Sequence, residues 1–430
     1  MNEAGGPFEP GGDFAIALDR ADPLARFREE FHVPRRESGE EEIYFAGNSL
    51  GLLPKRTPRY VDEELEKWKR LAVRAHFSGP NPWMPYHELL AKPMARLVGA
   101  SASAGEVVMM NSLTVNLHLM MASFYRPTRE RHRILIEDRA FPSDDYAVES
   151  QALVHGFDPA EALVRLRPGD GKHAIDTADV ARILERDGES IALVLLPGVQ
   201  YYTGQAFEIE EITRLAHAKG CVVGFDLAHA AGNLVLRMHD WNVDFAVWCT
   251  YKYLNSGPGS VGGCFVHERH GMRPDLPRLA GWWGHDKESR FRMEPGFRPI
   301  PGAEGWQLSN PPILSLAAIR ASLDVFMEAG GMDALREKSL RLTGYLEWLL
   351  ERETGRGIEI LTPADPRRRG CQLSLRVRSS GAGRSVFEKL EASGVTCDWR
   401  EPDVIRVAPV PLYNRYEEVF RFVEILRGAL

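Results

Sequence analysis

The sequence predicts an α/β protein, with a mainly parallel, doubly wound sheet in its larger part and a smaller α+β domain at its C-terminal end. Two observations carry this prediction. From about residue 85 to residue 267, short apolar runs typical of buried strands alternate with segments of helical spacing, and this alternation indicates parallel βαβ units. After residue 311 the pattern changes to long helices followed by short strands, and 430 residues are enough for both parts.

The elements follow in order along the chain. Residues 1–12 are rich in Gly and Pro and are expected to be disordered, and apolar spacing predicts helices over 13–34, which Pro34 closes, and over 60–73. In the larger part we expect strands at 133–138, 190–198, 221–230, 244–250 and 262–267, a strand that turns into a helix at 107–124, and a helix at 208–220 that ends on glycine. In the smaller part we expect a helix pair broken at Gly330 and Gly331, strands at 372–377, 395–400 and 404–410, and helices at 385–394 and at the C-terminus.

This order suggests three parts. Residues 1–60 are expected to form an arm that packs with the small domain, residues 61–311 to form the large α/β domain, and residues 312–430 to form the small α+β domain.

Composition excludes several classes of function. The net charge is −7 and no long basic block occurs, which argues against nucleic-acid binding. No run of about 18 apolar residues, the length needed to span a membrane, occurs in the sequence. The first residues lack the basic and apolar regions of a signal peptide, so a cytoplasmic protein is expected. The five cysteines form no CxxC pair and are expected to be buried, reduced thiols.

Polar side chains follow two consecutive predicted strands. Asp226 ends one strand and His229 comes three residues later, while Lys252 follows the next strand between Tyr251 and Tyr253. Ligands of open α/β sheets bind beyond the carboxyl ends of the strands, so these groups are expected at one edge. A lysine among aromatic residues is unusual, and burial there would favour its neutral amine.

Two further segments point to the same edge. A helix that starts at residues 111–114 offers free backbone N–H groups suited to phosphate, and Phe141 follows the strand at 133–138. Each feature alone has a plainer interpretation: Asp226 as a turn or cap residue, Phe141 as core, and the glycine-rich run 257–263 as a tight loop. Asp226 and His229 lack a third ligand at suitable spacing, so no metal site is expected.

Together these residues fit pyridoxal phosphate. That cofactor needs a lysine for its Schiff base, a carboxylate for its pyridinium nitrogen, an aromatic surface and an anion cradle.

The chain also resembles the kynureninases, fold-type I pyridoxal-phosphate enzymes related to the class V aminotransferases. The resemblance covers nearly the whole chain. It rests on the motifs FAGNSLGLLP, NSLTVNLHLM, FPSD, GFDLAHAAGN, YKYLNSGPG, GWWGH, LSNPPILSLA and IRVAPVPLYN.

The resemblance implies roles for individual residues. Lys252 would be the Schiff-base lysine, Phe141 would stack on the ring, and Asp226, with His229 nearby, would pair with the ring nitrogen. Arg406 would clamp the substrate α-carboxylate, a task suited to a guanidinium. The remaining implied cofactor contacts are Leu113, Thr114, Ser143, Asp144 and Tyr251, with Trp282 and Asn310 from the second subunit of a homodimer. The remaining implied substrate contacts are Ser49, His76, Ser309 and Asn310.

The implied reaction, within tryptophan and kynurenine metabolism, is hydrolysis of L-kynurenine or 3-hydroxy-L-kynurenine to anthranilate or 3-hydroxyanthranilate plus L-alanine, with Lys252 moving the α-proton and Tyr251 as an acid. Polar His76, Ser309 and Asn310 suggest that 3-hydroxykynurenine is accepted well, although His76 could equally cap a loop. One departure from the family is Pro197, which stands where a small hydroxyl residue is usual and offers neither hydroxyl nor N–H.

Two other functions compete with this interpretation. A cysteine desulfurase-like lyase of the same fold would need a mobile nucleophilic cysteine, whereas the cysteines here lie mostly in strand patterns. A non-catalytic binding protein of this fold would be expected to lack the lysine or the aspartate, and both are present.

Overall fold

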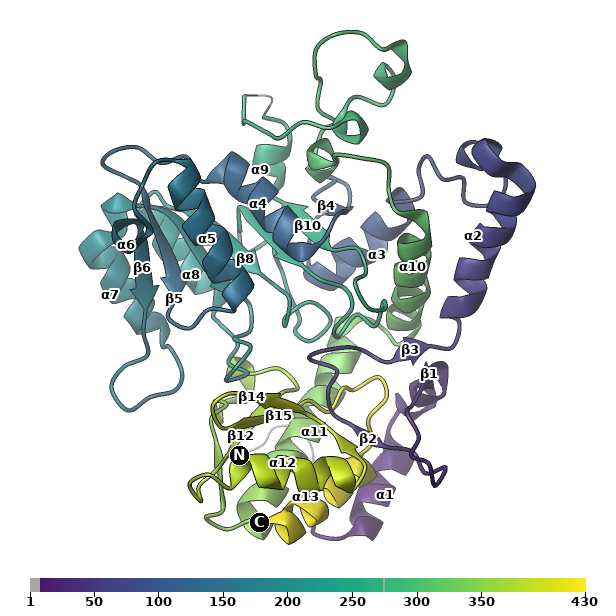
Figure 1. The fold of residues 1–430 in the computed structure, drawn as a ribbon, viewed down its shortest axis with the longest axis vertical. Coiled ribbons are helices and arrows are strands. Elements are labelled where there is room, and N and C mark those ends of the chain that lie inside the picture. Colours follow the sequence, from purple (N-terminus) through teal and green to yellow (C-terminus); the bar gives the residue numbers. More distant parts are fainter. Residues whose placement is uncertain (1–7, 274) are drawn as a thin grey trace.

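The computed structural model describes residues 8–273 and 275–430. Of the segment 1–12 that was expected to be disordered, residues 1–7 lie outside the described residues, and α1 begins at Gly12. Figure 1 shows two lobes, an upper one around a large sheet and a lower one that holds both the N-terminal helix α1 and the C-terminal helix α13.

The upper lobe is built on a seven-stranded sheet of order β4-β10-β9-β8-β7-β5-β6. The pairs β9-β8, β8-β7, β7-β5 and β5-β6 are parallel, whereas β10 runs antiparallel to both β9 and β4. The mainly parallel sheet is thus confirmed. Its strands are β4 (Val107–Met109), β5 (Arg133–Glu137), β6 (Leu163–Leu166), β7 (Ile191–Pro197), β8 (Val222–Asp226), β9 (Phe245–Trp248) and β10 (Gly263–Val266).

Helices cover both faces of this sheet, as the doubly wound prediction requires. Strand β7 shows why: Leu193 and Leu195 pack into a core with α4 (Leu113–Phe124) and α5 (Pro142–Val154), whereas Val194 and Leu196 pack into a second core with α7 (Thr177–Asp187) and α8 (Ile209–Ala218). Successive side chains of a strand point to opposite faces, so an unbroken apolar run needs cover on both sides. Shorter helices of the same lobe are α6 (Pro159–Ala162) and α9 (Glu268–Gly271).

The lower lobe contains a four-stranded antiparallel sheet of order β11-β12-β15-β14. Its strands and helices share one apolar core, in which α1 packs beside α13. The N-terminal segment joins this lobe through β2 (Ile43–Tyr44), which pairs in parallel with β13 (Val395–Thr396). The other elements are β11 (Ile358–Ile360), β12 (Leu373–Val377), β14 (Asp398–Arg400), β15 (Val404–Val407), α1 (Gly12–Ala21), α11 (Met332–Glu353), α12 (Gly383–Ala392) and α13 (Tyr416–Ala429).

Three further helices pack together beside the large sheet. Helix α10 (Ile313–Glu328) packs against α2 (Thr57–Leu71) and α3 (Glu88–Val98), and its buried residues belong to the core of the large sheet. The proposed boundary at residue 311 therefore lies before a helix that packs with the large part. The three-part division stays our proposal.

One predicted helix differs from the structure. The pattern over 13–34 predicts a single helix, but α1 ends at Ala21, followed by a 3₁₀ turn at Ala25–Glu30 and β1 (Phe31–His32), which pairs with β3 (Leu53–Pro54). Asp22 adopts an extended conformation because it precedes Pro23, whose ring disfavours helical geometry in the residue before it. Among the described residues, no helix is both long and apolar enough to cross a membrane.

Candidate active site

The ends of β8 and β9 bring three predicted residues together. Because the two strands are parallel neighbours, their carboxyl ends lie at one edge of the sheet. The turn after β8 directs His229 back toward the segment that follows β9, and Lys252 Nζ lies 2.9 Å from His229 Nε2. The carboxylate of Asp226 is held in place by a 2.6 Å hydrogen bond to Oδ1 from the backbone N–H of Ala228.

His229 is a neutral hydrogen-bond acceptor for the lysine. Burial, together with the nearby charge of Lys252, lowers the pKa of His229 well below its ordinary value. The neutral ring carries its proton on one nitrogen only, so when Lys252 donates to Nε2, the proton of the ring resides on Nδ1. The buried Nδ1 has no hydrogen-bond partner among the described residues.

Asp226 and Asp144 form a buried acid pair. Asp144 comes from the first turn of α5, and burial raises the pKa of both carboxyl groups, that of Asp144 well above its ordinary value. Two neighbouring carboxyls in a desolvated place cannot both ionise at little cost. The pKa of Asp144 is raised more than that of Asp226, so the neutral form is favoured more strongly at Asp144 and the negative charge at the strand-end residue. A third buried acid, Glu137 at the end of β5, adds to this effect.

Phe141 lies over the lysine with part of its ring open. Lys252 Nζ is 5.8 Å from the centroid of the ring, and the Phe141 side chain is 44% exposed. Tyr201 supports the ring edge-on at a centroid distance of 5.3 Å. An exposed aromatic face beside a half-buried lysine and a buried carboxylate is suited to stacking with a flat ligand.

Two helix N-termini meet beside these residues. α4 begins at Leu113 and α5 at Pro142, and the hydroxyl groups of Thr114 and Ser143 lie 2.7 Å apart across the two helix starts. Helix N-termini present unpaired N–H groups and a partial positive charge, which suit an anion. A Cβ atom added to Gly262 would lie 3.2 Å from the Leu113 nitrogen, so glycine keeps this cradle open.

The segment that carries Lys252 is held by a distant motif. The N–H of Gly51, from the sequence GNSLG, donates a 2.8 Å hydrogen bond to the carbonyl of Tyr251. Tyr253 is fully buried, whereas Tyr251 is only half-buried. Burial also raises the pKa of Tyr251 above its ordinary value, so its hydroxyl keeps its proton and can donate it.

Arg406 lies at the junction of the two lobes. It comes from β15, its side chain is 1% exposed, and its guanidinium donates to the carbonyl of Tyr201 at 2.7 Å and to Ser49 Oγ at 3.1 Å. The same guanidinium pairs with Asp398 of β14. Neither Tyr201 nor Asp398 was identified from the sequence. Only the strand register, which pairs Asp398 with Arg406, would have revealed the second.

Four predicted residues have no contact with this cluster within the described chain. Trp282 is 41% exposed, and Ser309 and Asn310, just before α10, are exposed as well. His76 packs edge-on against Trp83, with ring centroids 5.3 Å apart. The remaining residue of note, Pro197, ends β7 directly opposite Asp226 in the sheet register.

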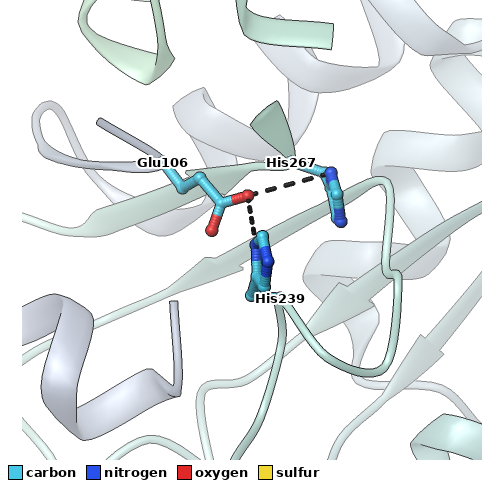
Figure 2. A group of neighbouring side chains, drawn as sticks. All are labelled: Glu106, His239 and His267. Atoms are coloured by element: carbon cyan, nitrogen blue, oxygen red, sulfur yellow. Dashed lines mark hydrogen bonds and ion pairs between the residues drawn. The ribbon is translucent and has the colours of Figure 1, made fainter. Parts of the chain in front are cut away.

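Groups that could share a metal ion occur elsewhere in the described chain, and neither contains Asp226 or His229. One of the two joins Glu106, His239 and His267 (Figure 2). Both oxygens of the buried Glu106 accept backbone N–H groups, at 2.7 and 2.8 Å, and the two imidazoles stack 5.1 Å apart. Glu106 Oε1 also lies 3.0 Å from His239 Nδ1. The group thus ties the chain before β4 to the segments that flank β9 and β10.

Two solved structures share this fold over nearly the whole chain. A variant of the lyase C-DES with glycine linked covalently to its PLP cofactor superposes with a TM-score of 0.77 at 18% identity, over 94% of this chain and 99% of the other. The apo cysteine desulfurase of Thermococcus onnurineus NA1 gives 0.73 at 18% identity, over 94% and 97%. The fold and the arrangement at the sheet edge define a fold-type I protein of the pyridoxal-phosphate class.

Sequence comparison narrows this class to one family. A kynureninase of Koribacter versatilis (strain Ellin345) is 57% identical over 421 residues, covering 98% of each chain, and one of Myxococcus xanthus (strain DK1622) is 56% identical with the same coverage. A family model for the kynureninase C-terminal domain matches residues 335–426. The chain belongs to the kynureninase family.

Proposed function

We propose that this protein is a pyridoxal-phosphate-dependent hydrolase that cleaves the side chain of L-kynurenine-type amino acids, releasing an anthranilate and L-alanine. Family membership over nearly the whole chain supports the reaction. The observation that carries the proposal is the cluster of Lys252, His229 and Asp226 at the carboxyl ends of β8 and β9, with the lysine amine 2.9 Å from a neutral imidazole.

The residues present fit pyridoxal phosphate. Two buried polar atoms near the lysine, His229 Nδ1 and Asp144 Oδ1, have no hydrogen-bond partner among the residues that the structure describes, and the cradle at Leu113 is open because position 262 is glycine. Lys252 would carry the cofactor, Asp226 would face its ring nitrogen, Phe141 would stack on its ring, and the helix starts with Thr114 and Ser143 would hold its phosphate. When bound, the cofactor supplies an electron sink next to the α-carbon of the substrate.

The protein's own groups supply orientation and proton transfer. The guanidinium of Arg406 binds the α-carboxylate and so fixes the substrate relative to Lys252. The amine of Lys252 takes and returns the α-proton, with His229 Nε2 as its hydrogen-bond partner. The protonated hydroxyl of Tyr251 acts as the acid at the side-chain carbonyl. Asp226 keeps its negative charge because the neutral form is favoured more strongly at Asp144.

The test of the lysine is direct. Lys252→Ala should lower kcat by roughly a thousandfold or more, because both the attachment point and the proton carrier are removed. The assay is anthranilate fluorescence, paired with borohydride reduction of the holoenzyme and peptide mapping. Lys172→Ala, an exposed lysine of the same lobe, is the matched control and should leave the rate unchanged. Anthranilate release by Lys252→Ala at the control rate, or label on another lysine, would refute the proposal.

We also propose a homodimer in which each site is completed by the other subunit. The support is an exposed aromatic surface of Phe77, Phe291 and Trp282, with centroid distances of 6.4 and 5.4 Å between neighbours, next to His76. An exposed apolar patch of this kind marks an interaction surface. Mixing inactive Lys252→Ala subunits with inactive Trp282→Ala subunits should restore activity, because one site of each mixed dimer is intact. Mixtures that stay inactive after confirmed exchange would contradict this arrangement.

For the substrate, we propose that 3-hydroxykynurenine is accepted well, since His76, Ser309 and Asn310 would place polar groups near its hydroxyl. A site that hydrogen-bonds a hydroxyl discriminates against the analogue that lacks it. The kcat/KM values for the two substrates decide the matter, and a clear preference for kynurenine would refute it.

The desulfurase alternative is disfavoured by the cysteines. All five are buried and free, and burial raises the pKa of each thiol, for Cys371 to about 12. A thiol that keeps its proton is a poor nucleophile. Five unpaired thiols also suit the reducing cytoplasm, which we propose as the location. Alanine formation from cysteine, compared with kynurenine in one assay, separates the two reactions.

A further inference from the structure

Arg406 shares its carboxylate partner with a second arginine. β14 and β15 are antiparallel with Asp398 opposite Arg406, so both side chains leave the same face of the sheet. Arg400 lies two residues beyond Asp398 and therefore also points to this face. Arg400 Nη2 is 3.1 Å from Asp398 Oδ2, the same oxygen that accepts from Arg406 Nη2 and from the Ser49 hydroxyl.

The charges in this group do not balance. Two guanidinium groups face one carboxylate, so the group carries one surplus positive charge. The side chain of Arg406 is almost fully buried, and its Nε has no hydrogen-bond partner among the described residues. Burying an uncompensated charge is costly. A second carboxylate on the Arg406 side would both neutralise the surplus charge and give the free N–H a partner.

Arg400 differs from Arg406 in its exposure. Its side chain is 36% exposed, against 14% for Asp398 and 1% for Arg406, so it reaches the group from the rim. The charges of both arginines nevertheless reach His229, the partner of Lys252, and each of them contributes to the lowered pKa of that histidine. The field of Arg400 thus extends to the catalytic lysine's surroundings without a contact to it.

We propose that Arg400 sets the affinity of the site for the substrate α-carboxylate by occupying Asp398, which frees Arg406 to bind a second carboxylate. This inference rests on the proposed function only in that the ligand is an α-amino acid. In the free protein Asp398 is shared by both arginines. When the substrate carboxylate binds Arg406, Arg400 remains as the counter-ion of Asp398, so the two carboxylates do not repel each other across one guanidinium.

Three variants separate this role from a structural one. Arg400→Gln leaves Arg406 paired with Asp398 as a neutral unit, so KM should rise about five- to tenfold, the effect of one partly exposed charge near the site, while kcat stays within about twofold. Arg400→Lys keeps the charge and should largely restore KM. The double variant Asp398→Asn with Arg400→Gln returns the surplus positive charge to Arg406, so its KM should fall back toward the native value.

A binding measurement on the holoenzyme tests the carboxylate itself. L-alanine and L-alaninamide, which differ in the charged carboxylate, are titrated by the change in visible absorbance. Arg400→Gln should weaken the binding of L-alanine by about five- to tenfold and leave the binding of L-alaninamide unchanged. Arg384→Gln removes the same charge from an exposed position on α12 and should change neither ligand.

Three results would each overturn the inference. They are equal weakening of the binding of both ligands by Arg400→Gln, no effect of Arg400→Gln on binding or KM, and a double variant whose KM does not fall back toward the native value. A protein that fails to cleave kynurenine but shows this alanine-specific charge effect would overturn the proposed reaction and leave the inference standing. A protein that cleaves kynurenine but does not show the charge effect would support the proposed reaction and overturn the inference about Arg400.

Discussion

Gly51 offers a sharp test of how the lysine is positioned, because a single methyl group at this position collides with the lysine segment. A Cβ atom on Gly51 would lie 2.3 Å from the carbonyl oxygen of Lys252, 2.3 Å from Asn255 Oδ1 and 2.8 Å from Asn255 Cα. Two of these three atoms belong to backbone that cannot rotate away. Ordinary contact begins near 3.4 Å, so Gly51→Ala requires the two segments to separate by about 1 Å, a misplacement that can cost on the order of a hundredfold in rate.

The expected outcome has a stability part and a functional part. Overpacking of this kind costs roughly 1–3 kcal/mol of unfolding free energy, and the displaced lysine should lower kcat by about a hundredfold and weaken cofactor retention. Urea unfolding, anthranilate fluorescence and absorbance titration with the cofactor measure the three effects.

The matched control is Gly428→Ala, at a helical position of α13 where an added Cβ meets nothing within 4 Å. It should be neutral or stabilising by up to about 1 kcal/mol. If Gly51→Ala binds cofactor and turns over at the native rate with unchanged stability, the contact between the GNSLG motif and the lysine segment does not control the site.

Two further predictions concern the framework of the protein. The carboxylate of Glu106 raises the pKa of His239 above its ordinary value, so this pair stabilises the fold below a pH of about 6.5, and the contribution is lost as the pH rises through the folded-state pKa. His239→Gln should therefore lower the midpoint of urea unfolding more at pH 5.5 than at pH 8.5. An equal loss at both pH values would contradict the pairing. Leu346 is fully buried in the core of the lower lobe, so Leu346→Ala should lower the unfolding free energy by about 2–5 kcal/mol. Leu346→Met should lower it by less than about 1.5 kcal/mol, as measured by the same urea unfolding. Similar values for the two variants would show that the core tolerates the lost volume.

Local patterns predicted the framework well. The strands at 133–138 and 190–198 are confirmed by β5 and β7, and the strand at 221–230 is confirmed by β8 as far as Asp226, after which the chain turns. Apolar runs bounded by polar turns leave few alternatives to a buried strand. β6 (Leu163–Leu166) and β11 (Ile358–Ile360) were not identified. Both are short and only partly buried, so they lack the apolar run on which the strand assignments depended.

The site shows the same division. The sequence identified Asp226, His229 and Lys252 as neighbours because consecutive parallel strands must end at one edge of a sheet. It could not predict that the pKa of Asp144 is raised well above its ordinary value, since this depends on how deeply α5 buries its first turn. Nor could it place His76 and Trp282 relative to the lysine.

The sequence by itself determined the class of fold, the strand ends at which Asp226 and Lys252 lie and the family motifs, because these depend on short-range periodicity and on residue type. Only the tertiary structure decided which distant segments meet: Gly51 against the lysine segment, α5 over Asp226, and Asp398 between Arg400 and Arg406. Such contacts join residues far apart in the chain and are fixed by strand register and by the packing of the two lobes. The charge and the position of each reactive group follow from that packing, which no local pattern encodes.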